Sequence, residues 1–200
     1  MKIIVIGGNG AVGRPIVDAL KENNELLIVG RSRGDIQADV EDVESIREMY
    51  KQAGKVDAVV TALGHGHFGP VTQMTGEQWM KGILHKALPQ VNVVLEGMPH
   101  MNDGGSFTLT SGVLNRDPIA GGSAGAAANG AIDSFVLGAA VEMPRGIRIN
   151  SVSAALLANS VDRFDGFFPG HIPVSLVKVG MAYKKCVEGV INGQCVVCDA

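Results

Sequence analysis

A glycine-rich segment near the N-terminus has the composition of a phosphate-binding loop. It follows the apolar run Ile3–Ile6 directly and consists of Gly7, Gly8, Asn9, Gly10, Ala11, Val12 and Gly13. The glycines satisfy both G-x-G-x-x-G and G-x-x-G-x-x-G. Positions without side chains let a backbone approach a pyrophosphate, and the N-terminus of a following helix supplies N–H donors and a positive dipole. We predict that this loop binds a dinucleotide; the alternative is a glycine-rich turn that serves packing alone.

The second expected strand ends in basic residues where an NAD-binding chain usually has an acidic one. In NAD sites an acidic residue about 20 positions after the loop hydrogen-bonds the ribose 2′-hydroxyl. Here the strand is followed by Arg31, Ser32 and Arg33. Guanidinium groups form charge-assisted bonds with phosphate, each about 1.5–3 kcal/mol. The pattern favours NADP over NAD by about one to two orders of magnitude, whereas a surface loop solvated by the same arginines is the alternative.

Alternating strands and helices are needed to position these residues. Continuous apolar, β-branched runs predict parallel strands that are covered on both faces, at 3–6, 26–29, 36–38, 58–60, 107–110, 147–152 and 195–197. Segments with helical periodicity lie between them, at about 11–22, 41–53, 75–98, 123–143 and 174–188. This alternation predicts an α/β fold with a doubly wound parallel sheet. Pro89 is expected to disturb the long helix near His85, four residues back.

Composition limits the class of protein. The 200 residues, 46% hydrophobic and 18% charged, predict one folded domain over residues 1–200. A net charge of −3 without a long basic run argues against a nucleic-acid partner. No apolar stretch is long enough for a membrane span, and the N-terminus lacks the pattern of a signal peptide. Three cysteines do not form a disulfide framework, so we expect a cytoplasmic protein.

Several segments together resemble the short-chain dehydrogenase/reductase family, over about residues 1–155 and 189–199. The most specific is residues 140–150, which is similar to the family's helix end and sixth strand. Residues 61–64, which include Ala62 and Gly64, replace the family's Asn-Asn-Ala-Gly segment. Asp39 and Val40 occupy the positions that contact adenine in the family. Residues 105–112 resemble the strand that ends in the catalytic serine, which identifies Ser111 as its counterpart.

This resemblance implies a specific fold and reaction. The implied fold is a Rossmann-type three-layer αβα sandwich with a doubly wound parallel seven-stranded sheet. The implied reaction is hydride transfer between NADP(H) and the carbonyl or alcohol group of a small molecule. A homodimer or homotetramer is implied in the same way.

The chain departs from the family at the proton donor. The family's Tyr-x-x-x-Lys pair would fall on Gly125 and Asn129, and residues 123–143 contain neither tyrosine nor lysine. The usual donor, a phenol whose pKa is lowered by a neighbouring ammonium, is therefore missing. The family's helical asparagine would fall near His85 or Lys86. Either residue is a candidate proton relay, or else a solvated or hydrogen-bonded helix residue.

Two further histidines follow the fourth expected strand at the functional edge of the sheet. His65 and His67 could act there as an acid, a base or a substrate contact, or serve only as loop residues. A pair of histidines without a third ligand is a poor metal site, so we expect no metal. Phe164, Phe167 and Phe168 lie where the family has its substrate loop, and they predict either an aromatic lid or an anchored loop.

Two functions follow from these residues. The first is a short-chain NADP-dependent oxidoreductase with a non-standard proton donor and an unspecified carbonyl or alcohol substrate. The second is a catalytically inactive NADP-binding module that senses the cofactor or binds a partner, which the loss of Tyr and Lys favours.

Overall fold

The computed structural model describes residues 1–64 and 66–200, which contain a parallel sheet in the strand order β3-β2-β1-β4-β5-β6-β7. The strands are β1 (Lys2–Ile6), β2 (Glu25–Gly30), β3 (Ile36–Gln37), β4 (Val56–Thr61), β5 (Met101–Thr110), β6 (Arg148–Ala154) and β7 (Cys195–Cys198). The predicted seven-stranded Rossmann-type fold is confirmed. The chain order reverses between β1 and β4, and ligands of open α/β sheets bind outside the carboxyl ends of the strands at such a switch point.

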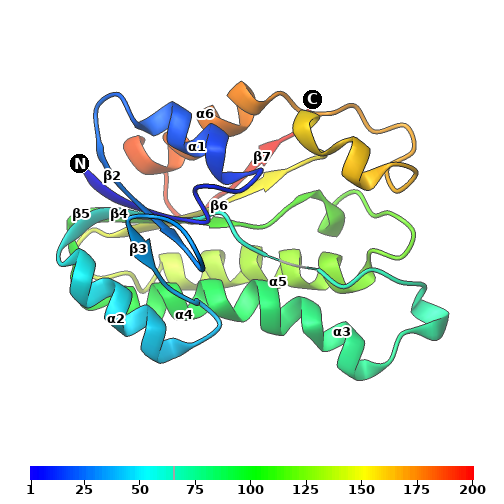
Figure 1. Cartoon of the computed structure of the whole chain (residues 1–200), viewed down its shortest axis with the longest axis horizontal. Helices are drawn as coiled ribbons and strands as arrows, with labels where there is room; N and C mark the ends of the chain where they lie inside the picture. Colours follow the sequence, from blue (N-terminus) through cyan, green and yellow to red (C-terminus); the bar gives the residue numbers. More distant parts are fainter. Residues whose placement is uncertain (65) are drawn as a thin grey trace.

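Helices cover both faces of the sheet, which gives three layers (Figure 1). One face carries α1 (Gly13–Leu20) and α6 (Leu176–Glu188), which pack against each other. The other face carries α2 (Val43–Ala53), α4 (Leu88–Gly97) and α5 (Ser123–Ala140). Alternate side chains of β1 enter the two separate cores: Ile3 and Val5 on the α1 side, Ile4 and Ile6 on the α2 side. A strand that is buried on both faces therefore reads as a continuous apolar run.

The long helix predicted at 75–98 is divided by a π-helical turn. α3 (Gly76–Gly82) continues into the π turn η2 (Ile83–Ala87) and then into α4, where Pro89 occupies the first turn. Pro89 has no N–H to donate to the carbonyl of His85, so the normal helical hydrogen bond is lost there. The predicted disturbance near His85 thus takes the form of a π turn, a feature frequent at functional sites.

The remaining differences from the sequence prediction concern the ends of elements. β5 begins at Met101, six residues before the apolar run at 107, because its polar first half extends beyond the buried centre. Its register against β4 shifts between Val56 and Ala58. None of the helices among residues 1–64 and 66–200 has the length and apolar character that a membrane crossing would need.

Candidate functional site

A cavity of about 680 Å³ lies where the carboxyl ends of the central strands meet the loops that follow them. The glycine-rich loop forms one end, together with Arg31 and Glu41. Apolar residues of the loops after β4 and β6 form the other end, and Lys86 lies on the wall with Asn129. The loop after β1, the π turn and α5 therefore contribute to a single cavity.

The glycine-rich loop leaves no space for side chains at its base. A Cβ on Gly13 would lie 2.1 Å from the carbonyl oxygen of Gly7, and one on Gly7 would lie 2.4 Å from that of Ala62. Gly7 also has a φ of +79°, which favours glycine. α1 begins at Gly13, so the positive end of its dipole faces this loop, although the Arg14 N–H already donates to the Gly10 carbonyl and Pro15 has no N–H. The cradle has the shape and the helix terminus that suit a pyrophosphate.

The predicted cofactor residues divide into those that line the cavity and those beneath it. Among the described residues, the cavity wall includes Gly7, Asn9, Gly10, Ala11, Val12, Arg31, Ser32, Arg33, Val40, Ala62 and Gly64. Gly8 and Gly13 lie behind the wall, where Gly8 packs at the Ile28 side chain. Asp39 also lies outside it, with its carboxylate accepting a hydrogen bond from the Glu41 N–H.

The two arginines at the end of β2 are exposed, and one is held by acidic neighbours. Arg31 Nε lies 3.8 Å from the Asp39 carboxylate, and its terminal nitrogen lies 3.9 Å from that of Glu41. Glu41 also contacts His85 Nδ1 at 2.8 Å. His85 therefore lies at the arginine end of the cavity. Sequence reasoning missed Glu41, although it follows the Asp39-Val40 pair directly.

Lys86 is the cation at the centre of the wall. Its Nζ donates hydrogen bonds to the carbonyl oxygen of Ser111 at 2.7 Å and to Asn129 Oδ1 at 2.5 Å. Its stem packs against Gly64, where an added Cβ would lie 2.4 Å from Lys86 Cγ. Burial lowers the pKa of Lys86 to about 8, against a weaker opposite effect of Asp133. None of the salt bridges of the described residues includes Lys86, so no carboxylate offsets this lowering of its pKa by direct contact.

Ser111 presents its backbone to Lys86. The Ser111 hydroxyl is buried and has no hydrogen-bond partner among the described residues. A Cβ at the next position, Gly112, would instead lie 3.1 Å from Asn129 Nδ2. A side chain at position 112 would therefore point toward Asn129 and Lys86, but this position is a glycine.

Gln90 is a buried polar residue that sequence reasoning missed. Its amide donates to the carbonyl oxygens of Lys86 at 3.0 Å and of Thr110 at 2.9 Å. Its Oε1 accepts from the Thr110 N–H at 2.8 Å and from the Thr61 hydroxyl at 2.5 Å. Gln90 therefore ties the π turn to the ends of β4 and β5, which fixes the backbone that carries Lys86. Its signal in the sequence is a polar residue directly after Pro89 in a helix that is mostly apolar.

The histidines after β4 contribute less than expected to the described site. His65 lies outside the described residues. His67 is half-buried and is not among the residues that line the cavity. Phe68 and Gly66 of the same loop do line it. No cluster of three or more His, Cys, Asp or Glu side chains suited to a metal ion occurs in the part of the chain that the structure describes.

A doubly wound parallel sheet with a glycine cradle at its switch point defines the Rossmann class of α/β proteins. The family model described as Enoyl-(Acyl carrier protein) reductase matches residues 14–168. The chain belongs to the short-chain dehydrogenase/reductase family of oxidoreductases.

Solved structures and curated relatives show the extent of the similarity. The crystal structure of the protein lin1944 from Listeria innocua is 44% identical with a TM-score of 0.96, and the match covers 98% of each chain. A small-chain dehydrogenase in complex with NADPH is 24% identical with a TM-score of 0.85, covering 100% of this chain and 96% of that one. Versicolorin reductase stcU of Emericella nidulans is 29% identical over 184 residues, or 86% of this chain and 65% of the relative. Short chain dehydrogenase claC of Passalora fulva is 29% identical over 125 residues, 60% of this chain and 47% of that protein. The chain thus spans about half to two thirds of these two curated relatives.

Proposed function

We propose that the chain is an NADPH-dependent reductase that converts a ketone or aldehyde into an alcohol, with Lys86 as the proton donor. The observation that carries this proposal is the Lys86 ammonium, which lies in the same cavity as the glycine cradle and is held by two neutral acceptors. The geometry supports a proton donor in a chain that lacks Tyr-x-x-x-Lys.

The cavity suits a phosphorylated dinucleotide. The pyrophosphate would rest on the backbone of Gly7–Gly13, since side chains there would collide with the loop itself. Arg31 and Arg33 would hold the 2′-phosphate, and Ser32 lies between them as a hydroxyl donor. Asp39 and Glu41 keep Arg31 on the cavity side without a close salt bridge, because both distances approach 4 Å. NADP rather than NAD is therefore the proposed cofactor.

Lys86 would complete the reduction by protonating the carbonyl oxygen. When bound, a reduced nicotinamide supplies a hydride to the carbonyl carbon. As the C=O electron pair moves to oxygen, Lys86 Nζ gives that oxygen a proton and becomes a neutral amine. Nζ has three protons as an ammonium, and Ser111 O and Asn129 Oδ1 take two of them. The third proton is available to the substrate, and solvent then reprotonates the amine.

The neighbours of Lys86 are arranged to favour this exchange. A carboxylate would stabilise the ammonium and hold its pKa high, whereas the carbonyl of Ser111 and the amide of Asn129 orient Nζ without a full negative charge. A pKa of about 8 lies close to neutral pH, where a general acid is most effective. Asn129 acts here as a positioning residue for Lys86.

A second function is a non-catalytic NADP-binding module. The observation that favours it is the glycine at position 125 and the asparagine at position 129, where the family's tyrosine and lysine would fall. This protein would bind NADPH and change no bond in a carbonyl compound.

Stereospecific deuteride transfer separates the two functions. The wild-type protein is incubated with NADPH carrying deuterium on one face of C4 and with a panel of ketones and aldehydes, and alcohols are analysed by mass spectrometry. The reductase transfers label from only one of the two C4 epimers to the carbinol carbon, and Lys86→Met lowers the rate of product formation at least about 100-fold. Binding of NADPH without labelled alcohol from any member of the panel would reject the reductase and leave the binding module.

A further inference from the structure

The end of the cavity beyond Lys86 is walled by aromatic and aliphatic side chains. They come from the loop after β4, the segment after β5 and the segment after β6: Phe68, Leu114, Leu156, Leu157, Phe164 and Phe168. Among the described residues that line the cavity, Glu41 is the only carboxylate, and it lies at the opposite end beside Arg31 and His85. The apolar end also includes the guanidinium of Arg163 beside Phe164. A substrate rich in hydroxyl groups would lose its hydrogen bonds to water against such a wall.

The aromatic rings contact one another across two segments that are far apart in the sequence. The ring of Phe68 lies 6.3 Å from that of Phe164, centroid to centroid, in a tilted arrangement. Phe164 lies 5.8 Å from Phe168 in an edge-to-face arrangement. Both spacings fall within the range in which ring quadrupoles attract. These three rings, which we call the ring wall, therefore join the loop after β4 to the segment after β6.

Two further contacts support the ring wall, one within its own segment and one to the cofactor cradle. The Arg163 guanidinium lies 5.4 Å from the Phe164 ring centroid, where the cation and the ring face attract. The side-chain amide of Asn159, at the base of the same segment, donates to the carbonyl oxygen of Ala11 in the glycine loop at 3.1 Å. The wall is thus anchored to the loop that would carry the pyrophosphate.

Glycines make the remaining surface flat. A Cβ at Gly66 would meet the Phe68 ring at 3.5 Å and the Cα of Gly125 at 3.7 Å, so the loop backbone runs close against α5. A Cβ at Gly125 would meet Leu114 at 3.1 Å, and no side chain projects from this position. A flat molecule can make van der Waals contact with a surface formed by peptide planes and ring faces.

We propose that the substrate of this site is an aromatic ketone of at least two fused rings, held against the ring wall with its carbonyl oxygen at Lys86. This inference rests on the proposed reductase function and gives it a substrate class. The bond changes are those of carbonyl reduction: the carbon gains the hydride, the C=O π bond breaks, and the oxygen gains the proton of Lys86. NADPH is the reductant, and the fused rings are unchanged.

The test compares 2-tetralone, which has two fused rings, with cyclohexanone, which presents the same ring ketone without the aromatic ring. The quantity measured is the ratio of kcat/KM for 2-tetralone to kcat/KM for cyclohexanone, with NADPH saturating. We expect a ratio of about 10 to 100, because the aromatic ring adds both buried area and ring contacts. Phe168→Ala should lower this ratio about tenfold, mainly through KM for 2-tetralone.

Phe167→Ala is the matched control, because this ring lies on the same segment but is 45% exposed and does not line the cavity. It contacts Phe68 at 6.0 Å, so it also reports any loosening of the segment. The ratio should stay within about twofold of the wild type. A wild-type ratio near 1, or equal losses in Phe167→Ala and Phe168→Ala, would overturn the substrate class while the reductase stands.

Binding of an unreactive ring compound keeps the inference testable if no ketone is reduced. Calorimetry with 2-naphthol and with cyclohexanol, both without NADP⁺, measures the same preference without turnover. At least about tenfold tighter binding of 2-naphthol, lost in Phe168→Ala, supports the ring wall even when the reductase fails. Equal affinities for the two alcohols would reject it.

Discussion

Replacing Lys86 tests the proposed proton donor at a single atom. Lys86→Met keeps an unbranched chain of similar length against Gly64 but removes Nζ and its bonds to Ser111 O and Asn129 Oδ1. Lys86→Arg keeps a cation and hydrogen-bond donors but has a pKa too high to release a proton near neutral pH. The first variant removes charge and acid together, and the second removes only the acid.

The expected size of the effect follows from the role of Nζ. A positioned general acid contributes about 10²- to 10⁴-fold to the rate, so both variants should lose at least about 100-fold in kcat/KM for carbonyl reduction. Binding of NADPH should change by less than about threefold, because Lys86 lies on the wall away from the glycine cradle and Arg31.

The pH dependence of the reduction rate should follow the protonation of Lys86. Reduction needs the ammonium, and burial sets the pKa of Lys86 at about 8. In the wild type, kcat/KM for reduction should be constant below about pH 7 and fall about tenfold per pH unit above 8. Oxidation of the corresponding alcohol should show the opposite dependence, since it needs the neutral amine.

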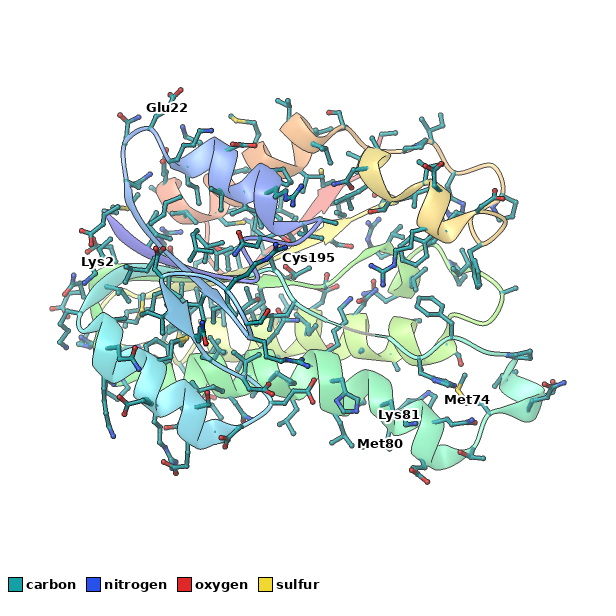
Figure 2. The ribbon with its side chains drawn as sticks, viewed as in Figure 1. Lys2, Glu22, Met74, Met80, Lys81 and Cys195 are labelled. Carbon is teal, nitrogen blue, oxygen red and sulfur yellow. The ribbon has the colours of Figure 1, made fainter. Side chains whose placement is uncertain are left out.

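Steady-state assays from pH 6 to 10 with NADPH and 2-tetralone or any reduced ketone measure both effects. Lys81→Met is the matched control, because Lys81 lies on α3 of the same long helix but is exposed and outside the cavity (Figure 2). Its kinetics should equal those of the wild type. Retention of more than one third of the activity in Lys86→Arg, with the fall above pH 8 preserved, would refute Lys86 as the donor.

Three further predictions concern stability and cofactor affinity. Burial lowers the pKa of Lys86 from 10.5 to about 8, so between these pH values the unfolded chain binds more protons than the folded one. The free energy of unfolding of the wild type, measured by urea titration, should therefore rise by about 2–3 kcal/mol relative to that of Lys86→Met from pH 8 to 10.5. A difference between the two proteins that does not change with pH would contradict the lowered pKa of Lys86. Replacing both Arg31 and Arg33 by alanine should weaken NADPH binding about 10- to 100-fold and leave NADH within about threefold by calorimetry, whereas equal losses would remove the 2′-phosphate role. Gly13→Ala should abolish NADPH binding and lower the melting temperature, because its Cβ would lie 2.1 Å from Gly7 O. The control Gly76→Ala, whose Cβ would meet nothing within 4 Å, should change neither quantity. The same NADPH affinity and melting temperature in both variants would contradict the packed cradle.

The fold was predictable because its signals are local. Buried parallel strands such as β1 and β4 are continuous apolar runs, and the amphipathic segments between them specify crossover helices. The glycine cradle was predictable for the same reason, since Gly7 and Gly13 are required by contacts within one short loop. The π turn was foreseen only as a disturbance before Pro89, because its form depends on how the chain compensates for the missing N–H.

The polar arrangement around Lys86 depends on tertiary packing and was largely hidden. The sequence showed Asn129 only as a missing lysine, whereas the structure places its amide 2.5 Å from Lys86 Nζ. The bond joins residues that are 43 positions apart, on two helices whose relative rotation no local pattern specifies. Ser111 is predicted from its hydroxyl, and the structure adds a contact that no local pattern specifies, the hydrogen bond from Lys86 Nζ to the Ser111 carbonyl oxygen.

All of the proposed chemistry depends on NADPH occupying the cavity between the glycine cradle and Lys86. The most direct measurement is a calorimetric titration of the wild-type protein with NADPH and, separately, with NADH. We predict one site per chain for NADPH and a dissociation constant about 10- to 100-fold larger for NADH. If neither NADPH nor NADH gives a binding heat, the cofactor assignment is contradicted, and the proposed reductase function with it.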